Sequence, residues 1–241
     1  RKCLGARYPQ LTAEVEARVA LELNLIDRLD LSGYFLIVWD IMEYARLHGI
    51  PAQGRGSAAN SIIAYVLGIT KVDPIRNRLF LGRFLNEEMS SIPDIDIDVS
   101  TAHREQLIQY VYGKYGREHA AMVCTFVTFQ ARNALREVGK VLGMPLHVVD
   151  RLAKSVSWYG YGPRNLQQEL TGIEEFNTYF SRVPFQEFLS ICMQLEDFPR
   201  HVSIHNGGVL ISSCPLSDIV PLEKATMPGR VVCQWDKDSV A

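Results

Sequence analysis

The first part of the chain shows a hydrophobic period typical of helices. Residues 12–31 carry apolar side chains every three or four positions, and Thr12 stands where an N-cap belongs. Four of these apolar positions lie on one helical face: Val15, Val19, Leu23 and Ile26. Residues 33–49 are apolar and then amphipathic, and they end on a Gly-Ile-Pro stop. The pattern predicts two helices, followed over residues 53–68 by a glycine-rich turn and a buried helix.

Further along, the period changes twice. Residues 93–99 alternate strictly between polar and apolar, which predicts a strand, and residues 102–115 follow as a helix. After a β-rich piece at 125–130 and an amphipathic helix at 131–143, the pattern over residues 145–200 is mainly helical. Three strands are expected near the end, at 207–212, 218–223 and 230–236. The predicted order is a mixed α and β part, a helical part and a return to strands.

Composition sets limits without indicating a function. The 241 residues are 47% hydrophobic and carry a formal net charge of −2, so bulk charge does not indicate nucleic acid or membrane. Five scattered cysteines without a CxxC pair argue against a disulfide framework or a zinc site and fit a reducing cytoplasm. No apolar run approaches the ~18 residues of a membrane span. The first residues lack both a signal-peptide core and an initiator methionine, so we expect the chain to be cut from a longer protein.

The segment "SIPDIDIDVS" places three aspartates, Asp94, Asp96 and Asp98, at alternate positions. On a strand they share one face at a spacing of about 7 Å, while the isoleucine and valine residues between them face the core. Two carboxylates at that distance repel by roughly 2.4 kcal/mol at an effective dielectric of ~20, and magnesium would relieve the repulsion. Adjacent carboxylates also suit a two-metal site. The alternative is an amphipathic edge strand whose charges prevent aggregation, and spacing alone does not decide between the two.

The stretch "GRGS" is a second candidate. Gly54 and Gly56 permit a tight backbone, and Ser57 can cap the helix that follows. Backbone N–H groups at such a turn suit phosphate, and Arg55 adds charge, although a capped turn without a ligand is the simpler interpretation. "GRGSAA" also matches the dinucleotide fingerprint G-x-G-x-x-A, with Asp73 about 20 residues further on. That fingerprint should follow a buried strand, and the preceding "ARLHGIPAQ" is not expected to form one.

The helix at 131–143 has two distinct sides. Arg132, Arg136 and Lys140 fall at i, i+4 and i+8 and form a basic stripe. The predicted apolar side comprises Ala134, Leu135, Val138, Val141 and Leu142. A basic stripe can follow a phosphate backbone independently of sequence. On spacing alone a solvated helix face, with Glu137 as a local partner, is the better-supported interpretation.

Two other features have simple explanations. His205 lies in "HNGG", and we predict a structural histidine beside glycines that let the backbone pass close to a neighbour. An aromatic, glycine-rich stretch could stack on bases, but packing on its own domain is the more common role. Its aromatic residues are Trp158, Tyr159 and Tyr161.

Several of these motifs occur together in one order. "GYFLIVWDIMEYARLHGIPAQGRGSAANSIIAYVLGITKVDP", "GRFLNEE" and "IPDIDIDV" resemble the catalytic core of bacterial DNA polymerase III alpha subunits, the C family of polymerases. The resemblance continues through "YGREHAAMVCTFVTFQARNALREVGKVLGMP", "FPRHVSIHNGG" and "MPGRVVCQWDKDSVA". It covers nearly the whole chain, and the last segments are most similar to the error-prone subgroup.

This resemblance implies an α+β fold, a polymerase-beta-like nucleotidyltransferase palm with an inserted, mainly α-helical thumb. The palm is expected at residues 1–125 and 204–241, and the thumb at 126–203. The family's third catalytic aspartate lies shortly after the "QWDKD"-like segment, and neither Asp236 nor Asp238 matches it. We therefore expect the second palm segment to be truncated and the chain alone to be inactive.

The resemblance also assigns site residues by motif. Gly56 and Ser57 match the Gly-Ser that contacts the triphosphate of the incoming nucleotide. Asp94 and Asp96 match two of the three metal-binding catalytic aspartates. Arg83, in "GRFLNEE", matches a basic residue near the nucleotide phosphates.

The implied activity is template-directed, two-metal transfer of a nucleotide from a deoxynucleoside triphosphate to a primer 3′-hydroxyl, with Mg²⁺ as cofactor and Mn²⁺ as a substitute. Catalysis would be mostly positioning and charge neutralisation. Template–primer DNA becomes the expected partner of Arg132, Arg136 and Lys140. Other replisome or lesion-bypass subunits would bind through regions outside this chain, in the cytoplasm and without a membrane. Asp98 shares the motif and is given a supporting role or none.

Three rival hypotheses stay open. A Rossmann-type dinucleotide-binding enzyme would use "GRGSAA" and bind NAD without metal, leaving Asp94 and Asp96 without a role. A nucleotidyltransferase with the same palm could act on something other than DNA, although the helical insertion argues against this. A pure DNA-binding module would bind duplex and ignore nucleotides.

Overall fold

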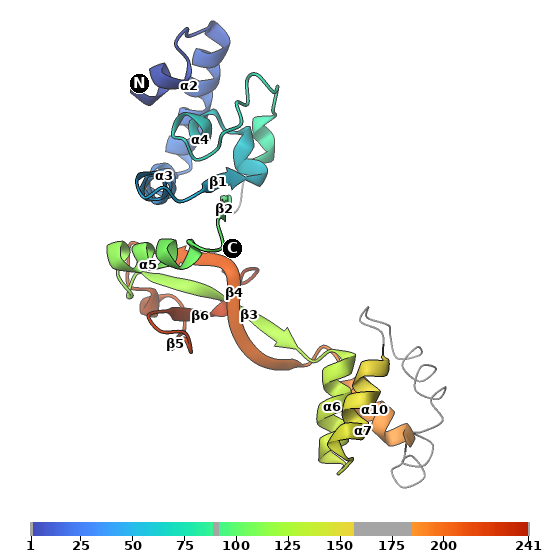
Figure 1. Cartoon of the computed structure of the whole chain (residues 1–241). Helices are drawn as coiled ribbons and strands as arrows, with labels where there is room; N and C mark the ends of the chain where they lie inside the picture. The colour runs from blue at the N-terminus through green and yellow to red at the C-terminus, as the bar shows by residue number, and fades with distance from the viewer. Residues whose placement is uncertain (1, 89–91, 157–184, 241) are drawn as a thin grey trace. The chain divides into compact units, whose positions relative to one another are not determined.

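The structure is a computed structural model that describes residues 2–88, 92–156 and 185–240 (Figure 1). It divides into two compact units. Unit 1 contains the residues up to Ala121, Val209–Val231 and the residues from Asp238 onward, and unit 2 contains Met122–Gly208 and Val232–Lys237. The mixture of helices and strands confirms the α+β class. The palm and thumb boundaries stay predictions.

Unit 1 is mainly helical around a small sheet. Its helices are α1 (Lys2–Arg7), α2 (Ala13–Arg28), α3 (Ser32–Leu47), α4 (Ile62–Val66) and α5 (Arg104–Tyr115), with 3-10 helices η1 (Gly56–Asn60), η2 (Leu81–Arg83) and η3 (Leu216–Asp218). Thr12 caps α2 as predicted, because its Oγ1 accepts a hydrogen bond from the backbone N–H of Val15 at 3.3 Å. The predicted helices over residues 33–49 and 102–115 are confirmed as α3 and α5.

The strands of unit 1 differ from the prediction. β1 (Ala52–Arg55) lies in a stretch that was not expected to form a strand, and β2 (Asp96–Val99) begins three residues later than predicted. β1 and β2 pair antiparallel in a two-stranded sheet, side by side in Figure 1. The strand predicted at 218–223 is wrong for most of its length, because only β5 (Leu222–Lys224) is extended there.

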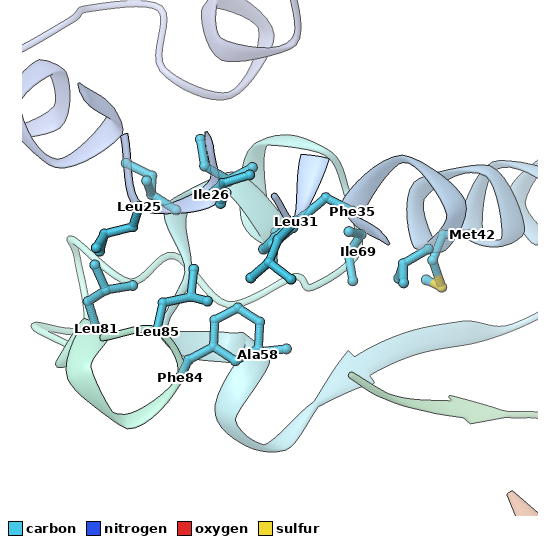
Figure 2. Packing of buried hydrophobic residues seen from close by; sticks show 14 of the residues in the cluster. Leu25, Ile26, Leu31, Phe35, Met42, Ala58, Ile69, Leu81, Phe84 and Leu85 are labelled. Atoms are coloured by element: carbon cyan, nitrogen blue, oxygen red, sulfur yellow. The ribbon is translucent and has the colours of Figure 1, made fainter. Parts of the chain in front are cut away.

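A hydrophobic core holds α2, α3, α4 and η2 together. Figure 2 shows Leu25 and Ile26 of α2 beside Phe84 and Leu85, the residues that follow η2. Leu23, predicted on the buried face of α2, is 51% exposed, so that part of the pattern is wrong. Each fully buried leucine, isoleucine or phenylalanine contributes about 1.5–3 kcal/mol relative to exposure. This core fixes the elements that carry the candidate site.

Unit 2 combines long strands with a group of helices. Its strands are β3 (Ala120–Thr128), β4 (Pro199–Ile211) and β6 (Val231–Asp236), and the unit boundaries fall within all three. The second sheet has the order β4-β3-β6-β5. β3 and β6 run parallel, with Met122 opposite Val232. β6 confirms the strand predicted at 230–236, and β4 begins eight residues before the strand predicted at 207–212.

In the described part of unit 2 the helices are α6 (Ala131–Val141), α7 (Leu146–Ser155) and α10 (Phe185–Leu195), which form one bundle (Figure 1). Ala134, Leu135 and Val138 of α6 are buried in its core, as predicted. The prediction for Val141 and Leu142 is wrong, since they are 85% and 37% exposed. The helix ends at Val141, so neither residue continues its buried face. Within the described residues, none of the helices is both long and apolar enough to cross a membrane.

Candidate active site

The β1–β2 pair brings the glycine turn and the aspartate strand together. Arg55 is the register partner of Asp96, and Gln53 is the partner of Asp98. Directly opposed residues in an antiparallel pair point to the same face. One face therefore carries charged and polar side chains, while Ile97 on the other face packs against the core of unit 1.

The alternation predicted for the aspartates is confirmed. Asp94, Asp96 and Asp98 are exposed, and Ile95 and Ile97 are partly buried against the core. Asp94 precedes β2, yet the alternation of exposed and partly buried residues already includes it. The three carboxylates thus face solvent.

Arg55 is the cation that faces this row. Its Nε lies 2.9 Å from Oδ1 of Asp98, and its Nη2 lies 3.8 Å from Oδ2 of Asp96. All three side chains are more than half exposed, so each pair contributes only about 0–1 kcal/mol to stability. The structure therefore gives Asp98 a definite contact: it holds the guanidinium of Arg55 next to Asp96.

Gly56 lies directly against the aspartate strand. Its φ of +67° is a left-handed conformation that favours glycine, and a Cβ there would lie 3.5 Å from Oδ2 of Asp96. Two motifs separated by 40 positions in the sequence thus lie side by side, with the carboxylate of Asp96 next to the turn at Gly56. Sequence alone identified both motifs but could not establish that they are neighbours.

Gly54 has a different role, in packing. Its N–H donates to the carbonyl of Ile69 at 2.7 Å, and a Cβ at this position would lie 2.8 Å from the same oxygen. The close approach ties β1 to the chain that follows α4. A side chain at position 54 would push the two backbones apart.

The serine that caps α4 is not the one predicted. Ser61 precedes α4, and its Oγ accepts a hydrogen bond from the N–H of Ala64 at 3.0 Å. Ser57 lies inside η1, where its carbonyl accepts from Nδ2 of Asn60 at 2.9 Å. The four residues 58–61 separate Ser57 from the first residue of α4, so the expectation that Ser57 caps the helix is wrong.

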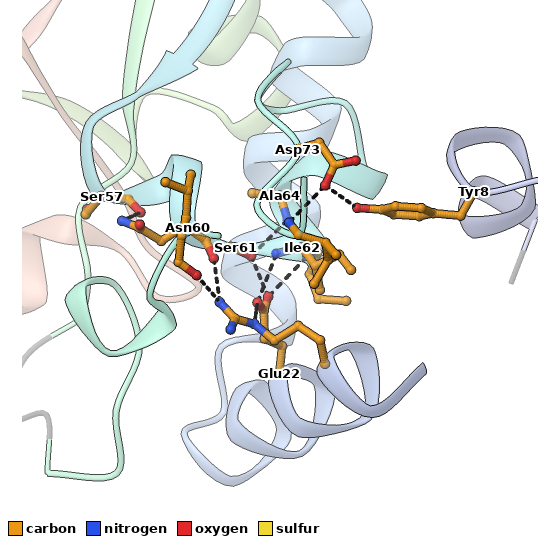
Figure 3. A network of polar contacts seen from close by, with 12 residues as sticks. Tyr8, Glu22, Ser57, Asn60, Ser61, Ile62, Ala64 and Asp73 are labelled. Carbon is orange, nitrogen blue, oxygen red and sulfur yellow. Dashed lines mark hydrogen bonds and ion pairs between the residues drawn. The ribbon is translucent and has the colours of Figure 1, made fainter. Parts of the chain in front are cut away.

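A buried carboxylate lies behind this turn. Glu22 of α2 is fully buried and accepts from Oγ of Ser61 at 2.8 Å and from the N–H groups of Ile62 and Ile63 at 2.9 and 3.1 Å (Figure 3). Nε of Arg18 lies 3.0 Å from its Oε1. Sequence analysis missed this residue. The available clue is that Glu22 follows Val15 by seven positions and so lies on the apolar face of the helix.

Tyr34 of α3 also belongs to this environment. Burial raises the pKa of Tyr34 to about 12, a backbone hydrogen bond at Ile95 acts in the opposite sense, and the charges of Asp94 and Asp96 raise it further. The phenol is therefore protonated at neutral pH. Its ring packs against the core of unit 1, which places an uncharged hydroxyl group near the aspartates.

Arg83 ends η2, which contacts η1. Its side chain is exposed, and the structure records no ion pair between it and another described residue. The element that carries Arg83 thus lies against the element that carries Ser57. This arrangement is compatible with the predicted contact to nucleotide phosphates, which stays a prediction.

The donor chemistry of the site fits magnesium in part. Asp94 and Asp96 offer carboxylate oxygens, the ligands that magnesium prefers. Among residues 2–88, 92–156 and 185–240, no three histidine, cysteine, aspartate or glutamate side chains are grouped closely enough to hold a metal ion. A metal held by the two aspartates would need further oxygens, such as those of a substrate phosphate or water.

The geometry argues against the dinucleotide hypothesis. A strand does precede Gly56, contrary to expectation, but β1 is antiparallel to its neighbour and is followed by a short 3-10 helix. A Rossmann fingerprint needs a parallel strand and a full helix. Asp73, the candidate ribose ligand, instead accepts hydrogen bonds from the hydroxyl of Tyr8 at 2.7 Å and the N–H of Ile75 at 2.9 Å (Figure 3).

The basic stripe on α6 has partners within unit 2. Nε and Nη2 of Arg132 donate to the carbonyl of Val156 at 3.0 and 2.6 Å. Nε of Arg136 lies 3.0 Å from Oδ1 of Asp150. Nζ of Lys140 lies 3.1 Å from Oε1 of Glu137, which confirms the local pair that the spacing indicated.

His205 makes backbone contacts of the structural kind. Its Nδ1 accepts from the N–H groups of Gly207 and Gly208 at 3.2 and 2.8 Å, so the neutral ring carries its proton on Nε2. These contacts agree with the predicted structural role. The aromatic residues Trp158, Tyr159 and Tyr161 lie outside the described residues.

Comparison with known proteins now adds the family. The model of the bacterial DNA polymerase III alpha NTPase domain matches residues 1–241. The chain belongs to the bacterial DNA polymerase III alpha family. An error-prone DNA polymerase of Anaeromyxobacter dehalogenans is 47% identical over 232 residues, which is 95% of this chain. Error-prone DNA polymerases of Teredinibacter turnerae and Bordetella parapertussis are each 43% identical over 97% and 98% of it.

These relatives confirm both the family and the error-prone subgroup that the sequence motifs indicated. The chain spans only 20–22% of the length of those relatives. The relatives do not favour a dinucleotide-binding enzyme. The site residues, by contrast, rest on motif and geometry alone.

Proposed function

We propose that this chain forms part of the palm, with an inserted helical thumb, of a DNA-directed DNA polymerase that transfers nucleotides by a two-metal reaction. The observation that carries the proposal is the position of the Asp96 carboxylate beside the turn, where its Oδ2 would lie 3.5 Å from a Cβ at Gly56. A turn suited to phosphate and a carboxylate suited to metal lie together, as a triphosphate bridged by metal requires. Residues 1–125 and 204–241 would be palm, and residues 126–203 thumb.

Each residue has a part that its surroundings support. Asp94 and Asp96 would hold Mg²⁺, with Mn²⁺ as a substitute. The bound metal would activate the primer 3′-hydroxyl and neutralise charge on the leaving pyrophosphate. Gly56 and Ser57 would place backbone N–H groups against the triphosphate, and Arg83 would add a positive charge from η2. The left-handed conformation of Gly56 supports this role, because it leaves the turn without a side chain beside Asp96.

Template–primer DNA would contact the basic stripe of α6. Arg136 and Lys140 are held only by partly exposed pairs of about 0–1 kcal/mol, so both can exchange a carboxylate for a phosphate at little cost. Arg132 is more constrained by its two hydrogen bonds to Val156. Its contribution to binding would be the smallest of the three.

The remaining partners belong to the whole protein. The relatives that match this chain are about five times as long as it is. We propose deoxynucleoside triphosphates and DNA as substrates of a cytoplasmic enzyme. Replisome or lesion-bypass subunits would bind through other regions. We propose that this chain alone does not polymerise, and primer extension by the chain alone would contradict this.

The decisive measurement is binding of a deoxynucleoside triphosphate to this chain with and without Mn²⁺, beside Asp96→Asn and with NAD as a comparison ligand. We expect metal-dependent binding that Asp96→Asn abolishes. NAD binding without metal would overturn the proposal. Triphosphate binding that ignores both metal and the substitution would contradict the role of the aspartates.

A further inference from the structure

We propose that Glu22 is a positioning residue for the Gly56–Ser57 turn and so determines nucleotide affinity without touching the nucleotide. The ligand named here rests on the proposed function. The positioning itself rests on contacts within unit 1. Glu22 lies on α2, far from the turn in sequence and before the first of the motifs quoted above.

A continuous chain of contacts connects the carboxylate to the turn. Arg18 lies 3.0 Å from Glu22 through Nε, and its Nη2 donates to the carbonyl of Asn60 at 3.0 Å. Asn60 in turn donates through Nδ2 to the carbonyl of Ser57 at 2.9 Å (Figure 3). Each of these three links is a directional hydrogen bond between partly buried groups. A shift of Glu22 would therefore be transmitted to the peptide group of Ser57.

Glu22 also decides which backbone donors remain for a phosphate. It accepts from the N–H groups of Ile62 and Ile63, the first two residues of α4, and thereby occupies the positive end of that helix. An anionic ligand cannot use those groups while the carboxylate is there. The donors left for the triphosphate are those of the turn itself, which lies beside Asp96.

The chemistry of Glu22 is not what helix packing alone would require. A buried ion pair carries a desolvation cost, and a well-packed apolar residue often stabilises a core equally well or better. Glu22 is nevertheless fully buried among apolar neighbours and beside Arg18. Directional contacts to Arg18 of α2 and to the start of α4, and through Arg18 to Asn60 of η1, are what the charge provides and an apolar side chain would not. We infer that orientation of the turn is its purpose.

The test compares Glu22→Gln with Asn60→Ala and with Asp40→Asn. Glu22→Gln keeps the shape but removes the charge that faces Arg18. Asn60→Ala removes only the last link to Ser57 and leaves the buried carboxylate intact, so it stays informative if Glu22→Gln does not fold. Asp40→Asn is the matched control, because it neutralises another carboxylate with several donors in unit 1, on α3, with no recorded contact to η1.

Two readouts separate positioning from general stability. We expect amide hydrogen exchange at residues 56–60 to accelerate in Glu22→Gln and Asn60→Ala, and affinity for a deoxynucleoside triphosphate with Mn²⁺ to fall about tenfold, equivalent to about 1.4 kcal/mol. In the complete polymerase, KM for the nucleotide should rise more than kcat falls. Asp40→Asn should leave exchange at the turn and nucleotide affinity unchanged.

The outcomes distinguish this inference from the function on which it rests. If the unsubstituted chain and the complete polymerase bind no nucleotide, the proposed function fails, while faster exchange at the turn still supports positioning. Unchanged exchange at residues 56–60 in a folded Asn60→Ala variant would overturn the positioning role. So would nucleotide affinity in Glu22→Gln and Asn60→Ala equal to that of Asp40→Asn.

Discussion

Glu22 and Asp96 are carboxylates of the same unit, but their surroundings differ in every respect. Glu22 is fully buried, and its oxygens accept four hydrogen bonds from neighbours on α2 and at the start of α4. Asp96 is about half exposed and has a long ion pair with Arg55 at 3.8 Å. The first group has no capacity left for a ligand. The second has most of its capacity free.

This difference indicates which carboxylates organise the site and which can act in it. A buried charge with all its partners cannot move or bind metal without a large cost. An exposed charge next to a like charge gains from a cation. The division between scaffold and chemistry therefore follows from burial and partners, and substitutions should separate the two.

The largest effect is expected at the buried carboxylate. Glu22→Ala removes the partner of Arg18 and of three donors, leaving them unsatisfied in the core, so we expect a loss of about 3–5 kcal/mol in the free energy of unfolding. Asp96→Ala should change it by less than about 0.5 kcal/mol, because only an exposed contact is lost. Urea unfolding followed by circular dichroism measures both. Equal losses of unfolding free energy in the two variants would contradict the distinction between a structural and an exposed carboxylate.

The two carboxylates also show what the sequence could and could not predict. Strict alternation identified the exposed face of the aspartates, because the two-residue period of a strand depends only on neighbouring residues. The buried state of Glu22 depends on the start of α4, 40 positions away. Helical period alone favoured Leu23 for the core, yet Leu23 is exposed and Glu22 is not.

Local signals failed in the same way around the glycine turn. Ser57 and Ser61 are both reasonable caps by residue type, and only the intervening 3-10 turn selects Ser61. β1 was missed because "AQGR" has a poor strand propensity, and its pairing with β2 supplies the hydrogen bonds that stabilise it. Tertiary contacts outweighed propensity in both cases.

Gly54 and Gly56 allow a similar comparison for the backbone, because alanine should destabilise the two positions for different reasons. Gly54→Ala should cost about 1–3 kcal/mol, because the new Cβ would collide with the carbonyl of Ile69. Gly56→Ala should cost about 1–2 kcal/mol for its left-handed conformation, since its Cβ would meet Oδ2 of Asp96 at 3.5 Å, an ordinary van der Waals distance.

Asparagine at each position is the control for these glycines. Asparagine tolerates the left-handed conformation, so Gly56→Asn should recover part of the loss and Gly54→Asn should not. Thermal unfolding measures all four variants. Recovery at position 54 would show that the close approach to Ile69 is not the constraint.

A smaller effect is expected for DNA binding by the basic stripe of α6, because Arg136 and Lys140 form only weak ion pairs within the protein. Reversing Arg136 and Lys140 together to glutamate should weaken duplex binding and flatten its salt dependence by about 2 in the logarithmic slope. A comparison of Lys140→Glu with Lys154→Glu controls for net charge, because Lys154→Glu makes the same charge change on α7. Fluorescence anisotropy with a labelled duplex at several salt concentrations measures the slope. A slope unchanged in the double variant would remove the stripe from the DNA interface.

The smallest effect concerns Asp40, a carboxylate between the two extremes. Burial raises its pKa, but hydrogen bonds from Lys114, Tyr110 and Tyr115 outweigh burial and lower the pKa below its ordinary value of 3.8. The contribution of these hydrogen bonds to the free energy of unfolding is therefore complete above about pH 4, and it is lost as pH falls through the lowered pKa of Asp40. Because Lys114 is largely exposed, we expect less than about 1 kcal/mol from the contacts of Asp40.

Asp40→Asn should therefore lower the free energy of unfolding slightly at pH 6 and flatten its decline below about pH 4. Some decline should remain, because Glu105 also has a lowered pKa, through its hydrogen bond from Gln109 and its contact with Arg230. Urea midpoints at several pH values measure the difference. An acid decline as steep in Asp40→Asn as in the unsubstituted chain would mean that these contacts add nothing. Asp40 would then belong with the exposed aspartates, and satisfied donors alone would not be enough to make a carboxylate part of the scaffold.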